Sequence, residues 1–432
     1  MAYRDKKVAL LGFGVENQAV VAYLERREAI LTVCDKNPSL PKISSISDYR
    51  LGPGYLKNLI DFDIIFRSPG IPFLTPEIQE ALQSGVSVTS STKLFFDECP
   101  AKIIGITGTK GKSTTASFLY QVLESAKAAS EIRGKVYLVG NIGTPAVSIL
   151  DQVEEPDLVV FELSSFQLQD LDCSPHIAVV LNISEDHLNH HRDIKEYTES
   201  KKNIVKYQTE NDYAVLDLRT ETGQNFAALT KARVANYAKV HLPENNLPWL
   251  YLGNLAAAAA AASLVGATEQ SITRGVADFK TLPHRLEHVG EIRGVLFYDD
   301  SKATTPDSTI GALKSFKRPI TLIVGGSAKG NDFGKLAEEI KESKVKRVIF
   351  IGTEGSRLAK LLQEIKAPQK LVSGGNSMRE IVKTALTLSH PGDVVLLSPA
   401  AASFDMFKNA EDRGNQFKKE FRKKKLFGWL IS

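Results

Sequence analysis

The sequence is poor in cysteine, tryptophan and methionine, and it has no long apolar run. The cysteines Cys34, Cys99 and Cys173 are odd in number and far apart, so they do not form a disulfide framework and suit a reducing cytoplasm. No apolar stretch reaches the roughly 20 residues that span a bilayer. Residues 1–15 lack the apolar core and cleavage site of a signal peptide. We therefore expect a cytoplasmic protein without a membrane span.

A strong charge of either sign is also lacking. The net charge of +4 is too weak to indicate nucleic-acid binding, and we expect small-molecule substrates and a monomer. One basic run, Lys418–Lys425, is interpreted as a solvated face of a C-terminal helix, with contact to nucleic acid or a membrane surface as the alternative. The length of 432 residues predicts two to four domains.

What the sequence does have is a regular alternation of short apolar runs and helical segments. The runs that indicate strands in the first part are Val8–Leu11, Ile30–Cys34, Asp63–Phe66 and Val86–Thr89. A helix is expected over Asn17–Arg27, and another begins at Thr75 and Pro76, with Thr as its cap and Pro in its first position. Continuous apolar strands separated by helices predict a parallel sheet covered on both faces.

The same alternation continues to the end of the chain. Later strands are expected at Lys102–Ile106, Asp157–Phe161, Ile177–Leu181, Val295–Tyr298, Ile320–Val324, Arg347–Ile351 and Val394–Leu397. The alanine run Ala256–Ala262 is interpreted as a closely packed helix, because alanine is the best helix former. We predict an α/β fold of three consecutive domains, at residues 1–96, 97–281 and 282–432.

The strongest motif is the segment Gly105-Ile-Thr-Gly-Thr-Lys-Gly-Lys-Ser-Thr114. Its three glycines let the backbone curl so that N–H groups point at an anion, and the following helix, expected over Ser113–Ala126, adds the positive end of its dipole. Lys112 can reach the terminal phosphates and the Ser113 hydroxyl can bind Mg²⁺. Five residues separate Gly105 from Gly111, whereas the standard phosphate-loop motif has four between the corresponding glycines. A strand before and a helix after favour ATP phosphate binding over a chance glycine-rich turn.

Polar residues follow the next strands. Glu162 stands at the carboxyl end of a buried strand, the edge where open α/β sheets bind ligands, so it is a candidate Mg²⁺ ligand, with a solvated loop glutamate as the alternative. Ser164, Ser165 and Gln167 are either helix-start polars or substrate contacts. His187 is a candidate ligand or substrate contact.

A zinc cluster of His187 with His190 and His191 is the alternative, but no cysteine pair or His-Glu-x-x-His accompanies them. We interpret His190 and His191 as loop surface.

In the N-terminal part, Gly12-Phe-Gly14 follows the first strand and Asp35 ends the second. This is a weak dinucleotide fingerprint, because Asn17 replaces the third glycine. It favours a nucleotide-type ligand near Gly14 and Asp35, and a dehydrogenase is the poorer alternative. The turn Ser68-Pro-Gly70 ends another strand.

In the third part, polar loops again follow strands. They are Asp299–Thr304, Gly325–Lys329 and Ser398–Ser403. An anionic co-substrate held by Thr304, Lys329 and Ser403 fits this pattern, and ordinary loop polarity is the alternative.

Taken together, these motifs resemble the Mur ligases over essentially the whole chain. The matching segments are Gly105–Thr114, Gly140–Gly143, Glu162–Leu168, Leu282–Arg285, Asp300–Thr304, Leu397–Asp405 and Glu411–Gly414. They look most like the members that add D-glutamate to UDP-N-acetylmuramoyl-L-alanine in peptidoglycan precursor synthesis. The resemblance implies a Rossmann-like UDP-binding domain, a P-loop ATPase-like central domain and a Rossmann-like C-terminal domain. It also implies an ATP-dependent amide ligase that works through an acyl phosphate.

The resemblance also assigns roles to residues of this chain. Those implied at ATP are Gly108, Thr109, Lys110, Gly111, Lys112, Ser113, Thr114, Asn254, Arg285, Asp300 and Lys302. Those implied at the UDP-linked substrate are Val15, Glu16, Asp35, Lys36, Gly70, Asn141, Ser164 and Gln167. Thr304, Lys329 and Ser403 would hold D-glutamate. Two Mg²⁺ sites are implied, with Ser113 at the first and Glu162, His187 and a carbamylated Lys201 at the second, so that Lys112, Glu162, His187 and Lys201 form the catalytic set.

The chain departs from the family pattern in places. The family's Gly-x-His-Asn-x-x-Asn is here Trp249-Leu-Tyr-Leu-Gly-Asn254, so only Asn254 remains of the adenine motif. Ala410 stands where the family often has a phenylalanine beside D-glutamate, for which Phe404 or Phe407 is a substitute. The alternatives are a Mur-type or folylpolyglutamate-type ligase with another acceptor, or an NTP-binding regulatory protein impaired in catalysis.

Overall fold

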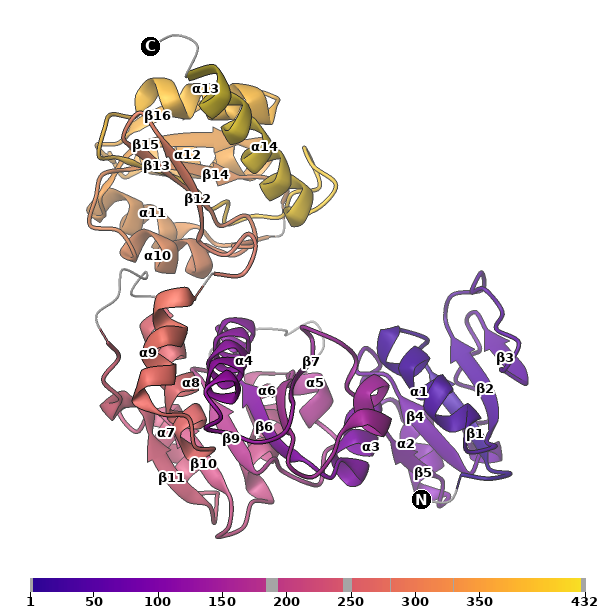
Figure 1. The fold of residues 1–432 in the computed structure, drawn as a ribbon. Coiled ribbons are helices and arrows are strands. Elements are labelled where there is room, and N and C mark those ends of the chain that lie inside the picture. The colour runs from indigo at the N-terminus through magenta and orange to yellow at the C-terminus, as the bar shows by residue number, and fades with distance from the viewer. Residues whose placement is uncertain (1–2, 184–192, 244–250, 280, 329, 429–432) are drawn as a thin grey trace. The chain divides into compact units, whose positions relative to one another are not determined.

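The structure is a computed structural model, and it describes all residues except 1–2, 184–192, 244–250, 280, 329 and 429–432. The chain divides into two units, Met1–Asn245 with Gly253–Phe279 and Asn246–Leu252 with Lys280–Ser432. Among the described residues, two sheets belong to the first unit and one to the second (Figure 1).

The first sheet is parallel throughout and has the order β3-β2-β1-β4-β5. Its strands are β1 (Lys7–Leu11), β2 (Ile30–Asp35), β3 (Asp48–Leu51), β4 (Ile64–Arg67) and β5 (Ser87–Thr89). The helices here are α1 (Val15–Glu25), η1 (Leu59–Asp61), α2 (Pro76–Gln83) and α3 (Ser91–Glu98). After β1 the chain adds β2 and β3 on one side of it, and then adds β4 and β5 on the other side. The carboxyl end of β1 is therefore the switch point where such sheets bind ligands.

All four strands expected in this part are confirmed, and so is the start of α2. Thr75 is the N-cap residue of α2, as expected, although its side chain makes no capping hydrogen bond. Its hydroxyl donates to the carbonyl of Pro72 at 2.6 Å, and it does not accept a hydrogen bond from the helix.

The second sheet is also parallel and has the order β11-β10-β9-β6-β8-β7. Its strands are β6 (Lys102–Thr107), β7 (Val136–Gly140), β8 (Leu158–Glu162), β9 (Ile177–Val180), β10 (Tyr213–Leu216) and β11 (Arg233–Asn236). The helices are α4 (Lys112–Ala128), η2 (Ala146–Gln152), α5 (Ser165–Leu168), α6 (Ile194–Lys206), α7 (Glu221–Ala227), η3 (Tyr237–Lys239), α8 (Leu252–Leu264) and α9 (Glu269–Asp278). The alanine run lies in α8 and is buried, as predicted. Helices α4 and α9 pack closely, since a Cβ on Gly275 would lie 2.5 Å from Val122.

The third sheet has the order β12-β13-β17-β14-β15-β16. Its strands are β12 (Glu287–Ile292), β13 (Val295–Asp299), β14 (Ile320–Gly325), β15 (Val345–Ile351), β16 (Lys370–Ser373) and β17 (Val394–Leu397). The helices are α10 (Pro306–Lys314), α11 (Gly334–Glu342), α12 (Gly352–Glu364), α13 (Met378–Leu388) and α14 (Ala410–Gly428). Strand β12 pairs antiparallel with β13, so this sheet is mixed.

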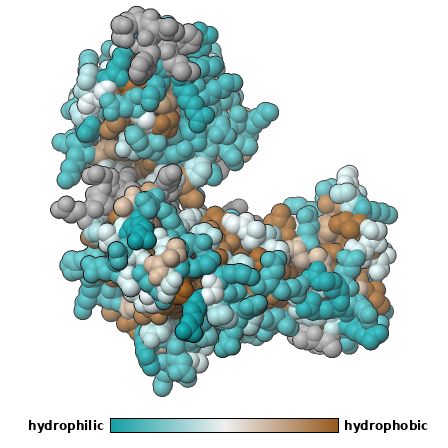
Figure 2. Space-filling view, in the orientation of Figure 1, coloured by the Kyte–Doolittle hydropathy of each residue, from teal (hydrophilic) through white to brown (hydrophobic). Residues whose placement is uncertain are grey.

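The basic run lies on α14. Phe417 and Phe421 on the opposite face of the helix are buried against Phe297 of β13, with ring centroids 5.9 and 5.1 Å away. Lys419 and Lys423 are exposed. The face of the molecule shown in Figure 2 is mostly hydrophilic, with apolar residues scattered between. Within the described part of the chain, no helix combines the length and apolarity needed to cross a membrane.

Candidate functional site

The phosphate loop runs from the end of β6 to the start of α4. Gly111 has a φ of +89°, a conformation that favours glycine. The side chain of Asn254 from α8 packs so closely here that a Cβ on Gly111 would meet its Oδ1 at 2.3 Å. The role predicted for Gly105 in curling the loop was wrong, because Gly105 lies inside β6, where a Cβ would clash with Pro175 at 2.7 Å. The loop between β6 and α4 is therefore Gly108–Gly111.

Two lysines reach the same carbonyl of this loop. The Lys112 ammonium donates to the carbonyls of Gly108 and Thr109, both at 3.0 Å. The Lys201 ammonium donates to the Gly108 carbonyl at 3.1 Å and to the Thr107 hydroxyl at 3.2 Å, from a side chain only 1% exposed. An anion placed at the loop would thus lie close to two cations.

Helix α6 supplies Lys201. Tyr197, one turn earlier, lies on the same face, with its hydroxyl 3.0 Å from that of Thr109 and its ring centroid 4.7 Å from the Lys201 ammonium. Asp193 caps the helix by accepting from the Glu196 N–H at 2.8 Å. The neighbouring Lys202 points elsewhere and pairs with Glu199 at 2.5 Å. The structure therefore brings Lys201, not Lys202, to the loop.

Glu162 ends β8, the neighbour of β6, and is 3% exposed. The end of β7 lies close against its backbone, since a Cβ on Gly140 would meet the Glu162 carbonyl at 2.3 Å. Asn141 follows in this loop and is exposed. A buried carboxylate therefore lies at the strand edge that carries the phosphate loop. His187, with His190 and His191, lies outside the described residues.

The loop after β1 is built by the residues expected to bind a nucleotide there. The Asp35 carboxylate accepts from the backbone N–H groups of Phe13 at 2.7 Å and Asn37 at 2.8 Å. The buried Asn17 amide donates to the carbonyls of Leu11 at 3.0 Å and Gly12 at 2.8 Å, which ties the loop to the strand. Asn17 is thus a structural replacement for the third glycine. Val15, Lys36 and Gly70 are exposed around this strand edge, and a substrate contact by them and by Asp35 stays a prediction.

Glu16 and Gln167, far apart in sequence, meet in the structure. The Gln167 amide donates to Glu16 at 2.8 Å, and the Ser91 hydroxyl donates to the same carboxylate at 2.5 Å. Burial raises the pKa of Glu16 above its ordinary value. The Gln167 side-chain carbonyl accepts from the Ser164 backbone N–H at 2.9 Å, and the Ser164 hydroxyl accepts from the Gln167 N–H at 3.3 Å, which forms a capping box at the start of α5. Ser164 and Gln167 therefore start a helix, and a contact with the substrate stays a prediction for both. The contact of Ser91 with Glu16 was not predicted from the sequence.

In the second unit, Asp300 is buried directly after β13. It accepts from the Ser398 hydroxyl at 2.8 Å and from the Leu286 N–H at 3.1 Å. Burial nevertheless dominates and raises the pKa of Asp300 to about 7. Loops that follow the adjacent strands β13 and β17 are thereby joined through a carboxyl group that can titrate near neutral pH.

Arg413 of α14 also binds the same two loops, and its individual role was missed. Its fully buried guanidinium donates to Ser301 through the hydroxyl and the carbonyl, both at 2.9 Å, and to the carbonyls of Ala401 and Ala402 at 3.2 Å. Burial lowers the pKa of Arg413 to about 10, so it stays charged at neutral pH.

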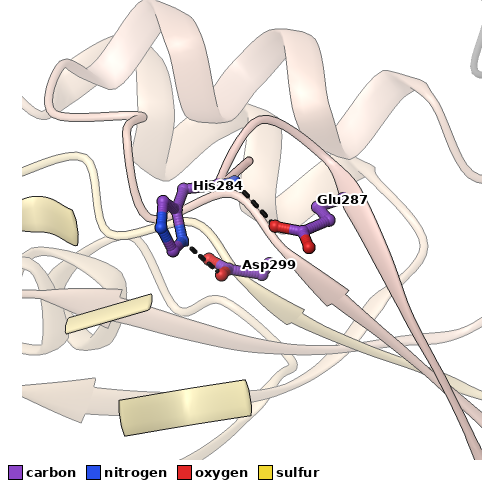
Figure 3. A group of neighbouring side chains, drawn as sticks. All are labelled: His284, Glu287 and Asp299. Carbon is purple, nitrogen blue, oxygen red and sulfur yellow. Dashed lines mark hydrogen bonds and ion pairs between the residues drawn. The ribbon is translucent and has the colours of Figure 1, made fainter. Parts of the chain in front are cut away.

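His284, Glu287 and Asp299 form a cluster whose ligand-type atoms lie within 4.8 Å of one another (Figure 3). The His284 ring nitrogen Nδ1 lies 2.7 Å from Asp299, and its backbone N–H donates to Glu287 at 2.9 Å. Glu287 also pairs with Lys418 at 2.9 Å. These groups satisfy one another, so the cluster orders the start of the second unit and is a poor metal site.

The remaining candidates in the second unit are placed individually. Arg285 and Lys302 are exposed, Thr304 is half-buried and Ser403 is buried. Lys329 lies outside the described residues. Of the two possible substitutes for the missing phenylalanine, Phe407 packs in the core and Phe404 is 71% exposed, and contact of either with D-glutamate stays a prediction.

Comparison with known proteins places this geometry in context. Residues 6–90 match the "Mur ligase MurD-like, N-terminal domain", residues 106–265 the "Mur ligase middle domain" and residues 284–401 the "Mur ligase, glutamate ligase domain". The UDP-N-acetylmuramoylalanine–D-glutamate ligase of Acetivibrio thermocellus is 37% identical over 96% of both chains, and that of Ruminiclostridium cellulolyticum is 35% identical over 96% of both.

A solved structure shares the fold. UDP-N-acetylmuramate–alanine ligase of Thermotoga maritima aligns with a TM-score of 0.58 and 16% identity, over 97% of this chain and 100% of that one. At this identity the likeness supports the three-domain architecture alone.

Proposed function

Since the chain belongs to the Mur ligase family, we propose that it joins D-glutamate to UDP-N-acetylmuramoyl-L-alanine with conversion of ATP to ADP and phosphate. The observation that carries the proposal is the identity to ligases of that name over nearly the full length of both chains. The geometry of the phosphate loop also supports the proposal, because Lys112 and Lys201 both reach its Gly108 carbonyl.

The reaction needs an activated carboxyl group. A carboxylate is a poor acyl donor at neutral pH, so its oxygen attacks the γ-phosphorus of ATP, which releases ADP and leaves an acyl phosphate. The amine of D-glutamate then attacks the acyl carbon. The tetrahedral species collapses to the amide, phosphate departs and the amine loses a proton. Lys112 would stabilise charge on the phosphoryl group in transfer.

The family is ATP-dependent and uses Mg²⁺, and residues at the loop fit that ion. The buried carboxylate of Glu162 and the hydroxyl of Ser113 are hard oxygen donors at the edge that carries the loop. We assign Ser113 to a first Mg²⁺ site, and Glu162, His187 and Lys201 to a second. When bound, the ion neutralises phosphate charge.

Lys201 would join this set as a carbamate. Carbamylation converts a cation into an oxygen anion that can bind a metal. The support is its buried position beside the loop, where an ammonium is costly to desolvate.

Recognition of the three substrates is assigned to separate groups of residues. ATP is assigned to Gly108–Thr114, Asn254, Arg285, Asp300 and Lys302. The UDP-linked substrate is assigned to Val15, Glu16, Asp35, Lys36, Gly70, Asn141, Ser164 and Gln167, and D-glutamate to Thr304, Lys329 and Ser403. Glu16 and Asp35 act mainly through the neighbours that they orient, because their carboxylates already accept protein hydrogen bonds.

The test is ADP release with UDP-N-acetylmuramoyl-L-alanine and a panel of amino acids. D-glutamate should support turnover well above L-glutamate and buffer, and Lys112→Ala should abolish it. Equal rates with D- and L-glutamate would reject the assignment. Turnover with another amino acid would instead identify a related ligase with a different acceptor.

A further inference from the structure

Arg67 is a fully buried arginine at the end of β4, and it lies outside the motifs described above. Its Nε donates to Asp170 at 2.9 Å and its Nη2 to the carbonyl of Phe166 at 2.9 Å. Its Nη1 donates to the carbonyls of Ile71 at 2.7 Å and Ser68 at 3.4 Å. One side chain therefore joins the first sheet to the segment that follows β8.

The two elements that Arg67 joins each carry residues assigned above to the UDP-linked substrate. On one side is the turn Ser68–Gly70, which also abuts the loop after β1, since a Cβ on Gly12 would lie 3.0 Å from that of Ser68. On the other side is α5, which contains Phe166 and Gln167 and is capped by Ser164. One planar guanidinium thus binds both elements directly.

We propose that Arg67 is a positioning residue for the UDP-linked substrate, holding the Gly70 turn and α5 at the spacing that this ligand requires. The inference rests on the proposed function for the identity of the ligand. Only arginine suits the position, because its fork presents several donors in fixed directions, whereas the lysine ammonium is a single point charge.

The test separates positioning from stability with two variants. Arg67→Lys keeps the charge opposite Asp170 but cannot reach both elements. We expect KM for UDP-N-acetylmuramoyl-L-alanine to rise about tenfold or more, with kcat and KM for ATP and D-glutamate within about twofold, since displacing a positioning group by about 1 Å has effects of this size.

The double variant Arg67→Met with Asp170→Leu removes both buried charges and leaves apolar groups of similar size. It should regain most of the thermal midpoint lost by Arg67→Lys, because replacing a buried ion pair by packed apolar side chains is often neutral. Its KM for the UDP-linked substrate should stay raised, because the donors to Phe166 and Ile71 are gone.

Lys93→Met is the matched control. Lys93 of α3 pairs with Asp172 at 2.5 Å, so it also links α3 to the segment after α5. Among the described residues, its ammonium donates to Asp97 and Asp172, which belong neither to the Gly70 turn nor to α5. All three KM values should stay within about twofold, as expected for a partly exposed pair.

The inference is overturned if Arg67→Lys lowers the thermal midpoint without changing that KM, if the double variant restores both, or if all three KM values rise together. Absence of D-glutamate-dependent turnover in the wild type rejects the proposed function alone. Calorimetric Kd values for UDP-N-acetylmuramoyl-L-alanine, measured without ATP, then decide on Arg67. A wild type that does not bind this compound rejects both.

Discussion

The phosphate loop of the first unit and the Ser398–Ser403 loop of the second are each held by a buried cation, but the two cations differ in kind. Lys201 presents one ammonium to the Gly108 carbonyl and the Thr107 hydroxyl. Arg413 presents a fork that binds Ser301, Ala401 and Ala402 at once. A lysine can be modified or change its protonation, while arginine stays charged and fixed in geometry.

The difference indicates a reactive role for the site of Lys201 and a structural role for the site of Arg413. A convertible amine lies beside the loop that would bind the reacting phosphates. A permanent guanidinium lies where loops from different strands must keep one arrangement. Replacing each cation should therefore affect different quantities, turnover for Lys201 and folding stability for Arg413.

The largest effect is expected for Lys201→Ala. We expect turnover to fall by about a thousandfold or more, the scale seen when an electrostatic group at a reacting centre is removed. Short carboxylic acids should restore part of it by supplying an oxygen anion in the vacated space. ADP release with and without acetate measures both. Lys202→Ala is the matched control and should keep wild-type turnover, because Lys202 pairs with Glu199 away from the loop. Full activity in Lys201→Ala would remove that lysine from the mechanism.

Arg413→Lys should mainly reduce folding stability. It removes charge-assisted hydrogen bonds to buried carbonyls, so the free energy of unfolding of the second unit should fall by about 2–4 kcal/mol. Hydrogen exchange of the amides in β13 and β17 measures the loss in the full-length chain. Arg422→Lys, on an exposed position of the same helix, should change stability by less than about 0.5 kcal/mol. Equal effects of the two variants would show that Arg413 is not a tie between loops.

Asp300 gives a pH-dependent prediction for the same loops. Its pKa is raised to about 7 in the folded chain, against an ordinary value near 4. Between about pH 4 and pH 7 the folded state therefore binds the extra proton, and stability falls as pH rises through this window. Asp300→Asn should remove that part of the pH dependence, measured by denaturant unfolding across the window. Ser398→Ala should move the upper limit of the window to higher pH, because it deletes a hydrogen bond that favours the ionised form. An unchanged slope in Asp300→Asn would assign the dependence to another group.

The smallest effect is expected on the basic face of α14. Replacing Lys419 and Lys423 by alanine should change the free energy of unfolding by less than about 0.5 kcal/mol each, because both are exposed and the pair of Lys423 with Glu420 is at the surface. Thermal unfolding and ADP release should both match the wild type. Salt-sensitive binding of the wild type, but not the double variant, to DNA or anionic vesicles would favour the alternative interpretation of this run.

Much of the fold was predictable because its central strands are continuous apolar runs. β1, β6, β8, β14 and β17 all appear where such runs predicted them. The missed strands are short or half-exposed. β12 (Glu287–Ile292) and β16 (Lys370–Ser373) carry charged residues, so neither is a continuous apolar run. The antiparallel pairing of β12 with β13 depends on a tight connection that no run revealed.

The residues of the candidate site likewise include some that a local pattern predicted and others that no local pattern predicted. The phosphate loop and Glu162 were found because a motif or a strand end marks them. Ser91, Arg67 and the individual role of Arg413 were not found, since each acts through contacts with distant segments. The Arg67–Asp170 pair spans 103 positions, and no local pattern relates two residues at that separation.

The phosphate loop and its place between a strand and a helix follow from the order of the amino acids, because all of its parts are contiguous and follow backbone geometry. Three features emerged only from the packing of the folded chain: Gly105 belongs to the strand, Lys201 and not Lys202 reaches the loop, and the carboxylates of Asp35 and Glu16 accept hydrogen bonds from protein groups. Lys201 lies 93 positions from Gly108. Packing against α6, not neighbourhood in the chain, brings a lysine to that carbonyl.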